Sequence, residues 1–389
     1  MPRVYVGCFG SGLGHASRML EVAGALRELG WEVRMSSSGE VASMIEKKGF
    51  ACNLLPLADV KYAPTGEFAM RETITASPAI LLRTYQQVAH EVENIGRFAP
   101  DVVLSDSALS TVLAARVHRL PTFTVLNQLN LTSTHGHQGA ATRLLSVGTS
   151  SGMGKLWEFS DEVLLPDLPP PYTISEKNLW GSNVEKTRYV GFLIPSGRGT
   201  PDGAGREFAA DPRPKVFWQV SGPPRTRSAM VNKALVLSKE LSDEFVFVVS
   251  GGDPSSGPDP LRTGGGWYYG WCSIAEFYFH ACDVVVSRAG HGTIGQTILS
   301  QKPSLLIPIP RQPEQEGNAE KASRLGVSIV LQQDELDAEG LRDSLRAMTG
   351  GGFADKAKRL GYWAASFNAK EEVVRTLDSA VSRGRQAHR

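Results

Sequence analysis

Apolar residues along the first third of the chain alternate between two periods. The run Val4–Phe9 is short and continuous, which predicts a buried strand, and apolar positions then recur at helical spacing until Gly30 ends the pattern. Another apolar run begins at Trp31, and later runs at residues 102–105 and 122–126 are again separated by helical stretches. Strands that alternate with helices predict a parallel sheet covered by helices on both faces.

The same alternation returns in the second half after a break in composition. Residues 191–214 are rich in glycine, proline, serine and arginine, which is typical of a surface connection between domains. Strands are then predicted at residues 215–220, 245–249, 283–287 and 305–307. We therefore predict an α/β protein of two Rossmann-like domains, residues 1–195 and 196–389, which face each other across a cleft. The final helix, predicted over residues 353–381, is long enough to pack back on the first domain.

Composition narrows the class of protein. The 389 residues are 41% hydrophobic and 21% charged, as in globular proteins, and the net charge of +1 disfavours nucleic acid as a partner. Four cysteines are scattered without the spacing of a zinc site, so we expect reduced, structural thiols. The chain begins without the features of a signal peptide, and no apolar run reaches about 18 residues. These features predict a cytoplasmic protein.

A strand, a glycine turn and a helix follow one another near residue 290, and this order is typical of an anion site. The strand 283–287 leads to Gly290 and Gly292, and the helix is expected to begin at Thr293. Free amides at a helix N-terminus attract phosphate, Thr293 is expected to cap that end, and Arg288 adds a cation. An ordinary turn whose glycines serve backbone geometry alone is the alternative.

Another glycine loop follows the first strand. Gly10, Gly12 and Gly14 precede His15. This pattern, Gly-x-Gly-x-Gly-His, is close to the dinucleotide-binding fingerprint Gly-x-Gly-x-x-Gly but differs from it in the spacing of the last glycine. No acidic residue ends the next strand, where residues 36–39 are Ser-Ser-Ser-Gly, so a dinucleotide oxidoreductase is disfavoured. Two domains that each carry a glycine loop at a strand end indicate an enzyme that joins two ligands.

With these motifs the chain resembles the GT-B nucleotide-sugar glycosyltransferases. Its C-terminal half is similar to the lipid-linked N-acetylglucosaminyltransferase of peptidoglycan synthesis, and the chain as a whole is similar to the UDP-glycosyltransferase superfamily. The resemblance is strongest over Asp283–Gly326, moderate over Gly10–Arg18 and Asp101–Pro121, and rests on topology elsewhere. It implies an N-terminal acceptor domain, a C-terminal donor domain, a UDP-linked sugar as co-substrate, and neither a metal nor another cofactor.

The resemblance also implies a set of donor-binding residues. Gln296 would face the ribose, where most relatives have a glutamate that accepts from both hydroxyls, and this departure leaves the identity of the nucleotide open. Glu314 and Gln315 match the acidic and amide pair that binds the donor sugar, and the base is expected near Trp271 and Cys272. The positions that remain on the donor side are Gly12, Gly14, Ser221, Gly222, Arg288, Gly290, His291, Gly292 and Thr293.

A catalytic role follows from the same resemblance for His15 and Asp106. Inverting transfer needs a base that takes the proton of the acceptor hydroxyl, and a neutral histidine suits that task near pH 7. A carboxylate on the far ring nitrogen would orient the ring and stabilise the imidazolium. Both residues follow predicted strands, so they can meet at one edge of the sheet. The alternatives are a phosphate-binding His15 and an Asp106 that caps the next helix.

The acceptor side is less defined. Apolar Ile80, Leu81 and Leu82, with Arg71, Arg83 and Arg97 as basic neighbours, predict either a peripheral membrane contact for a lipid-linked acceptor or a half-buried helix face. The stretch 127–130 is expected either to line the acceptor site or to form a capped loop. The sequence offers no third metal ligand near His135 and His137, so we expect a solvated loop there rather than a metal site.

Taken together, these motifs predict an inverting glycosyltransferase that uses a nucleoside diphosphate sugar and a hydroxyl acceptor of undefined class. A nucleotide-sugar 2-epimerase is an alternative, but it needs several carboxylates in the cleft, where only Asp106 and Glu314 are candidates. A non-catalytic protein that binds nucleotide sugars is the other alternative.

Overall fold

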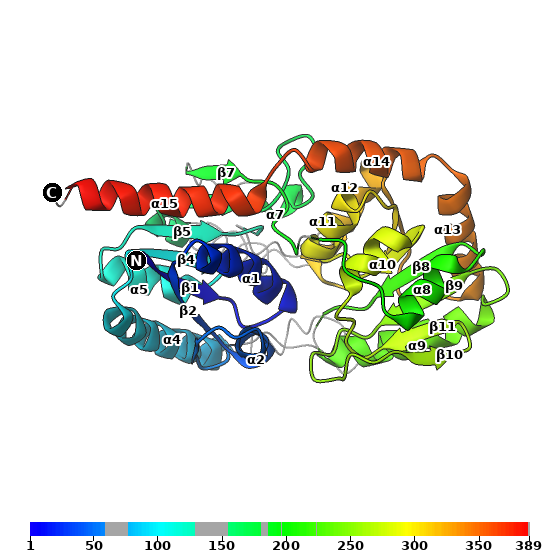
Figure 1. The fold of residues 1–389 in the computed structure, drawn as a ribbon, viewed down its shortest axis with the longest axis horizontal. Helices are drawn as coiled ribbons and strands as arrows, with labels where there is room; N and C mark the ends of the chain where they lie inside the picture. The colour runs from blue at the N-terminus through cyan, green and yellow to red at the C-terminus, as the bar shows by residue number, and fades with distance from the viewer. Residues whose placement is uncertain (59–76, 129–154, 180–185, 196, 223, 388–389) are drawn as a thin grey trace, which may run out of the picture.

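The computed structural model describes residues 1–58, 77–128, 155–179, 186–195, 197–222 and 224–387. These residues form two α/β domains side by side, each built on a seven-stranded sheet (Figure 1). The predicted boundary at residue 195 falls between the last strand of the first sheet and the first strand of the second. The predicted fold class is therefore confirmed.

The first sheet is parallel throughout, in the order β3-β2-β1-β4-β5-β6-β7. Its strands are β1 (Arg3–Cys8), β2 (Glu32–Ser37), β3 (Cys52–Leu54), β4 (Val102–Asp106), β5 (Thr122–Val125), β6 (Glu162–Leu165) and β7 (Thr187–Tyr189). The connecting helices are α1 (Leu13–Glu28), α2 (Gly39–Lys47), α4 (Ser77–Phe98), α5 (Leu109–Val117), the short η1 (Trp157–Phe159) and α7 (Glu176–Leu179). The central strands β1 and β4 are buried almost throughout, because helices cover both faces.

The second sheet has the order β10-β11-β9-β8-β12-β13-β14 and is parallel except for its edge strand β10. Its strands are β8 (Lys215–Gln219), β9 (Val246–Ser250), β10 (Leu261–Thr263), β11 (Gly266–Tyr269), β12 (Val284–Ser287), β13 (Ser304–Leu306) and β14 (Ser328–Val330). The helices are α8 (Gly203–Ala210), α9 (Pro224–Glu240), α10 (Ala275–Ala281), α11 (His291–Leu299), α12 (Pro313–Arg324), α13 (Ala338–Gly350) and α14 (Phe353–Ala364). The β10–β11 hairpin was not predicted, because each strand has only three or four residues.

The predicted single C-terminal helix is wrong, because the chain forms α14 and then α15 (Ala369–Ala387). Its predicted return is right: α14 packs on the second domain, whereas Val373 and Leu377 of α15 lie in the core of the first. Figure 1 shows α15 lying across the first domain. Between the two helices, Phe367 packs against Gly191, where a Cβ atom would come within 2.3 Å of the Phe367 Cβ. The two connections between the domains therefore pass each other in close contact.

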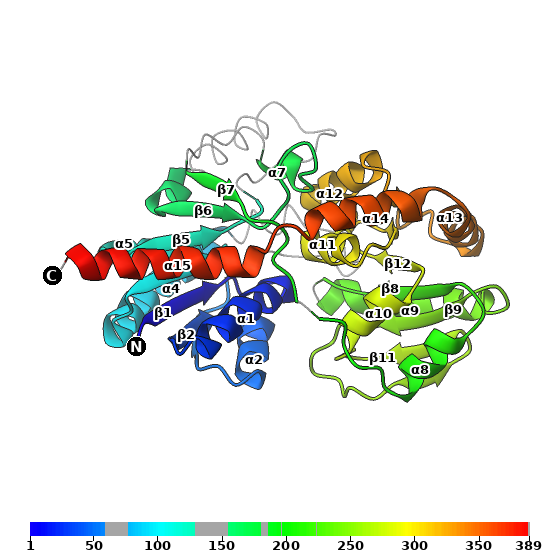
Figure 2. The same ribbon diagram turned by 45° about the horizontal axis from the view of Figure 1, so that its top comes forward.

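Residues 167–179 of the first domain also pack on the second. Leu168 and Ile174 share one hydrophobic cluster with Ile294 of α11 and Ala319 of α12. The short helix α7 lies against α12, as Figure 2 shows, and Lys321 of α12 donates to Glu176 at 2.5 Å. The junction between the domains therefore has a core of its own.

Candidate active site

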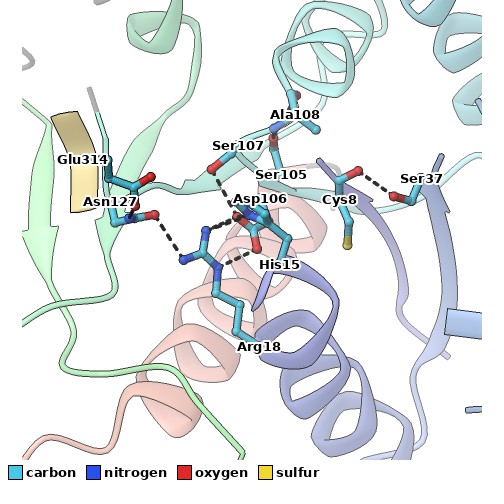
Figure 3. Close-up of polar contacts among 10 residues, drawn as sticks. All are labelled: Cys8, His15, Arg18, Ser37, Ser105, Asp106, Ser107, Ala108, Asn127 and Glu314. Atoms are coloured by element: carbon cyan, nitrogen blue, oxygen red, sulfur yellow. Dashed lines mark hydrogen bonds and ion pairs between the residues drawn. The ribbon is translucent and has the colours of Figure 1, made fainter. Parts of the chain in front are cut away.

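The base side of the site is formed where β1 and β4 end next to each other. Cys8 pairs with Asp106 in the sheet register, so Asp106 is the last residue of β4, and the loop after β1 leads directly to α1. Gly12 allows that loop to turn with a φ of 94°, which places His15 in the first turn of α1. His15 Nδ1 lies 3.0 Å from Asp106 Oδ1 (Figure 3). The structure thus brings together the two residues for which a joint role was predicted.

The alternative role of Asp106 as a helix cap is wrong. The helix α5 begins at Leu109 with Ala108 at the N-cap position, and no side chain caps it. The amide of Ala108 donates instead to Ser105 Oγ at 3.2 Å. The carboxylate of Asp106 faces α1, where it is wholly buried.

Arg18 is a member of this site that the sequence analysis missed. It follows His15 by three positions on α1, so both side chains lie on the same face of the helix. Its Nε donates to Asp106 Oδ2 at 2.6 Å, and its Nη2 donates to Asp106 Oδ1, which is a two-pronged contact with both oxygens (Figure 3). The spacing of three residues after His15 was the only signal in the sequence.

The charges of this group stabilise an ionised Asp106. Burial would raise the pKa of Asp106, but the charges and hydrogen bonds of Arg18 and His15 outweigh it and lower the pKa to about 2. Burial raises the pKa of the neighbouring Cys8 thiol well above its usual range. Asp106 and Arg18 are thus a charged pair in a site that is almost closed to solvent, with His15 at its more exposed edge.

The donor side lies at the start of α11, after β12. The helix begins at His291, with Gly290 at the N-cap position and no side-chain cap, so the first amides are left without intrahelical acceptors. The prediction that Thr293 caps this end is wrong, because Thr293 lies inside the helix, where its carbonyl oxygen accepts from Thr297 Oγ1. An uncapped helix N-terminus of this kind is a suitable place for an anion.

Arg288 is a buried cation beside this helix start. Only 3% of the residue is exposed, and Nη1 donates to the backbone oxygens of Ile307 and Pro308 at 3.2 and 3.3 Å. Within the described ranges its Nε has no hydrogen-bond partner, and no carboxylate pairs with the guanidinium. Burial lowers the pKa of Arg288 to about 10. A buried positive charge without a counterion is costly, and an anionic ligand would compensate it.

The side chain of His291 points toward the first domain. Its Nε2 lies 3.0 Å from Asp167 Oδ2, although the ring nitrogen is not aligned for a hydrogen bond, and the ring packs on Phe192. Asp167 is itself fully buried and accepts hydrogen bonds from Ser175 and two other backbone amides. The contribution of His291 to a donor site is therefore limited to its backbone, while its ring belongs to the domain junction.

Glu314 and Gln315 lie in the first turn of α12, after β13. Glu314 is half-buried, and its Oε1 accepts from Asn127 Nδ2 of the first domain at 3.3 Å (Figure 3). Gln315 is buried, and its Oε1 accepts from the amide of Ile309 at 3.0 Å, which fixes the orientation of the side-chain amide. Gln296 lies on α11 and is 8% exposed.

The other predicted donor residues are more dispersed. Gly222 follows β8 with a φ of 110°, and a Cβ there would come within 2.9 Å of Thr226 Oγ1. Ser221 precedes it and is half-buried, whereas Gly14 lies within α1 and is exposed. Trp271 is half-buried against the core of the first domain, and burial raises the pKa of Cys272. Arg71, Asn130, His135 and His137 lie outside the described residues.

Two family models match the chain on either side of this junction. The glycosyltransferase family 28 C-terminal domain matches residues 271–360, which include Arg288, α11 and α12. The model described as glycosyl transferase family 1 matches residues 2–145, which include His15, Arg18 and Asp106. Both halves of the candidate site therefore lie in segments that are similar to glycosyltransferases.

Individual relatives agree with this assignment. A protein described as an uncharacterized glycosyltransferase from Methanosarcina acetivorans is 25% identical over 96% of this chain and 97% of its own length. A UDP-N-acetylglucosamine–N-acetylmuramyl-(pentapeptide) pyrophosphoryl-undecaprenol N-acetylglucosamine transferase from Prochlorococcus marinus is 42% identical, but over 16% of this chain and 18% of its own. The spinosyn rhamnosyltransferase SpnG has a TM-score of 0.71 at 18% identity, covering 97% of this chain and all of its own, and was also solved with thymidine diphosphate.

Because Arg18 has a carboxylate partner and Arg288 has none, we expect their replacement to affect the stability of the protein differently. Arg288→Met should leave the free energy of unfolding of the ligand-free protein within about 1 kcal/mol of wild type, because it removes a charge without a counterion. Arg18→Met should lower it by about 3–5 kcal/mol, since ionised Asp106 is then left buried and uncompensated. Chemical denaturation of the two variants at pH 7 measures this difference.

The pH dependence of the same measurement is a second check. The pKa of Asp106 is lowered from 3.8 to about 2, so the stabilisation from its pairing is present above the ordinary value and lost as the pH falls toward 2. The difference between wild type and Arg18→Met should therefore narrow below about pH 4. Equal destabilisation by Arg18→Met and Arg288→Met at every pH would contradict this interpretation.

Proposed function

The chain is a glycosyltransferase with the GT-B fold, and we propose that it transfers a sugar with inversion from a nucleoside diphosphate sugar to a hydroxyl acceptor. One observation carries the proposal. Asp106 engages Nδ1 of His15, whereas Nε2 makes no hydrogen bond to any other described residue, on a side chain that is 21% exposed. An oriented imidazole with its second nitrogen accessible has the form of a general base.

The proposed reaction has one displacement step. The acceptor oxygen attacks the anomeric carbon while its proton moves to Nε2 of His15, and the bond between that carbon and the phosphate oxygen breaks. The electron pair of this bond leaves with the nucleoside diphosphate. Asp106 stabilises the imidazolium that forms, and the amides at the start of α11 together with Arg288 stabilise the leaving diphosphate. Since the base and the sugar phosphate lie on opposite sides of the anomeric carbon, the product is inverted.

The donor assignment rests on the uncapped N-terminus of α11 and the uncompensated charge of Arg288. A diphosphate would supply the counter-charge that the described residues do not provide. The Prochlorococcus relative is named for a UDP-linked donor and SpnG was solved with thymidine diphosphate, so we propose a pyrimidine nucleotide, with UDP as the first choice. Gln296, which stands in place of a glutamate, is compatible with either UDP or thymidine diphosphate.

Epimerisation fits the site less well than transfer. Inversion at the carbon next to the anomeric carbon requires a base that removes and returns the proton there, while the nucleoside diphosphate leaves and re-adds at the anomeric carbon. Free carboxylates are needed for this, but Asp106 is engaged by Arg18 on both oxygens. Glu314 is then the one remaining candidate carboxylate from the predicted set. A binding protein without catalysis has no need for the oriented His15.

The acceptor is proposed to be a lipid-linked or other partly apolar alcohol. Leu81, Leu82 and Tyr85 on α4 are 70%, 58% and 72% exposed, whereas Ile80 is half-buried, so part of the predicted patch faces solvent. Arg83 is exposed beside them, but Arg97 pairs with Glu93 and lies about 21 Å further along the helix. No helix among the described residues is long and apolar enough to span a membrane. A peripheral contact of this patch with a membrane surface is therefore our proposal.

Donor binding should be visible without added metal. We expect UDP-glucose or UDP-N-acetylglucosamine to raise the melting temperature in the presence of a chelator, because Arg288 and the helix start supply the positive charge. The matching GDP and dTDP sugars test the choice of nucleotide. Arg288→Met should abolish the shift although it keeps the apo protein stable. No shift with any of these nucleotides would sink the donor assignment.

Loss of the base should affect turnover and spare donor binding. His15→Ala should reduce the single-turnover rate by roughly a hundredfold to ten-thousandfold, which is the usual contribution of a general base. The donor dissociation constant should stay within about twofold, because the phosphates are held by the other domain. His90→Ala, which removes an exposed histidine from α4, is the matched control. A weakened donor affinity in His15→Ala would instead indicate that His15 binds phosphate.

The α4 patch should bind membranes if the acceptor is lipid-linked. We expect the protein to cosediment with vesicles containing anionic phospholipid at low salt, and Leu81→Ser/Leu82→Ser with Arg83→Glu should prevent it. Arg97→Glu, at the far end of the same helix, should have little effect. Absence of cosedimentation by wild type would contradict the membrane contact and leave small alcohols as acceptors.

A further inference from the structure

A chain of polar side chains connects the base to the donor side across the domain junction. From Asp106 it continues through Arg18, whose Nη1 donates to Asn127 Oδ1 at 3.3 Å. Asn127 Nδ2 in turn donates to Glu314 Oε1, also at 3.3 Å (Figure 3). Arg18 and Asn127 are 7% exposed each, so the bond between them is buried, whereas the bond to the half-buried Glu314 is partly buried. Four side chains from α1, β4, the loop after β5 and α12 therefore form one continuous network.

The polarity of the network allows only one orientation of Asn127. A guanidinium can only donate hydrogen bonds, and a carboxylate can only accept them. The amide of Asn127 must therefore present its oxygen to Arg18 and its nitrogen to Glu314, as observed. An aspartate would face Glu314 with a second negative charge, and a leucine would break both bonds. Asn127 thus has a chemical requirement that its position in a loop did not reveal.

Arg18 has two effects on His15. Its two-pronged contact prevents the carboxylate of Asp106 from rotating, which keeps Oδ1 in place for Nδ1. Its Nη2 also lies 3.2 Å from Nδ1 of His15. An N–H of the arginine can bond to that nitrogen only if Nδ1 carries no proton, whereas the 3.0 Å contact with Asp106 requires a proton there.

Resting on the function proposed above, we propose that Arg18 is the positioning residue of the base and that Asn127 links it to the donor-side Glu314. Through this link, the orientation of Asp106 and His15 depends on the same network that reaches the donor sugar. Arg18 acts through Asp106, and Asn127 acts through Arg18.

The first experiment measures the ring of His15 directly and needs no substrate. The groups that face this ring are Asp106 and Arg18, with the ring of Phe9 against its edge and Cys8 as a neutral thiol behind Asp106. In Arg18→Gln, the ring ¹⁵N chemical shifts of His15 should change from those of a single neutral tautomer to those of a mixture, because Asp106 is no longer held against Nδ1. Arg27→Gln, an exposed arginine on the same helix, should leave these shifts unchanged. Unchanged ring ¹⁵N shifts in Arg18→Gln would overturn the role of Arg18.

Arg18→Lys separates charge from geometry and keeps the test valid if the glutamine variant folds poorly. Lysine retains the charge but cannot bind both oxygens of Asp106 in parallel. The single-turnover rate with the nucleotide sugar that wild type uses should therefore fall about tenfold or more, although the charge is kept. A wild-type rate in Arg18→Lys would contradict positioning.

Asn127 tests the link between the two sides. Asn127→Leu and Asn127→Asp should each lower the single-turnover rate at saturating donor by about tenfold, because either change breaks the bond to Glu314 or to both partners. In an Arg18→Lys background the loss from Asn127→Leu should largely disappear, since its effect passes through Arg18. Weaker donor affinity with an unchanged rate, or losses that multiply with Arg18→Lys, would show that Asn127 only binds donor.

Failure of this inference can be told apart from failure of the proposed function. If wild type releases nucleotide from the sugar donor and His15→Ala does not, the function stands whatever the Arg18 and Asn127 variants show. If His15→Ala releases nucleotide as fast as wild type, the proposed function fails. The ring ¹⁵N chemical shifts of His15 would still decide the role of Arg18.

Discussion

The negative charge of Asp106, enclosed where water does not reach, determines the arrangement of the base side. A buried carboxylate without a partner is costly, and here Arg18 and His15 compensate it from the same face of α1. The ends of β1 and β4 place α1 and Asp106 next to each other, so the fold of the sheet and the charge pair require one another. His15 obtains its orientation from this arrangement, and its side chain is the one member of the group that is partly exposed.

The two domains contribute different charged groups to the site. Contacts at the domain junction hold these groups in place relative to one another. The predicted donor side differs from the base side, because Arg288 is a buried cation with no carboxylate partner among the described residues. The residues around Asp167, the helix α15 and the Asn127–Glu314 contact tie the start of α11 and α12 to the first domain. Under the proposed function, a sugar phosphate bound at this junction would be attracted at its phosphate end by Arg288, whereas the charges of Asp106 and Arg18 already compensate each other.

Much of this arrangement could be predicted from the sequence, because buried strands follow from local patterns. The alternation of apolar runs predicted two parallel sheets. The resemblance to GT-B glycosyltransferases implied the pairing of His15 with Asp106, and the rule that strand ends meet at one edge allowed it. Arg18 was missed because its role depends on a partner 88 residues away rather than on its neighbours. The break between α14 and α15 lies where Phe367 packs on Gly191, and α11 begins at His291 with no side-chain cap. Neither feature has a local sequence pattern from which it could be predicted.

A crystal structure with an unreactive 2-fluoro analogue of the nucleotide sugar would test the central claim most directly. The account predicts diphosphate oxygens within hydrogen-bond distance of the amides of residues 291–293 and of Arg288 Nε, with the anomeric carbon facing Nε2 of His15 across the space of one hydroxyl. A diphosphate bound instead on the loop of residues 10–14, or a sugar turned away from His15, would contradict it.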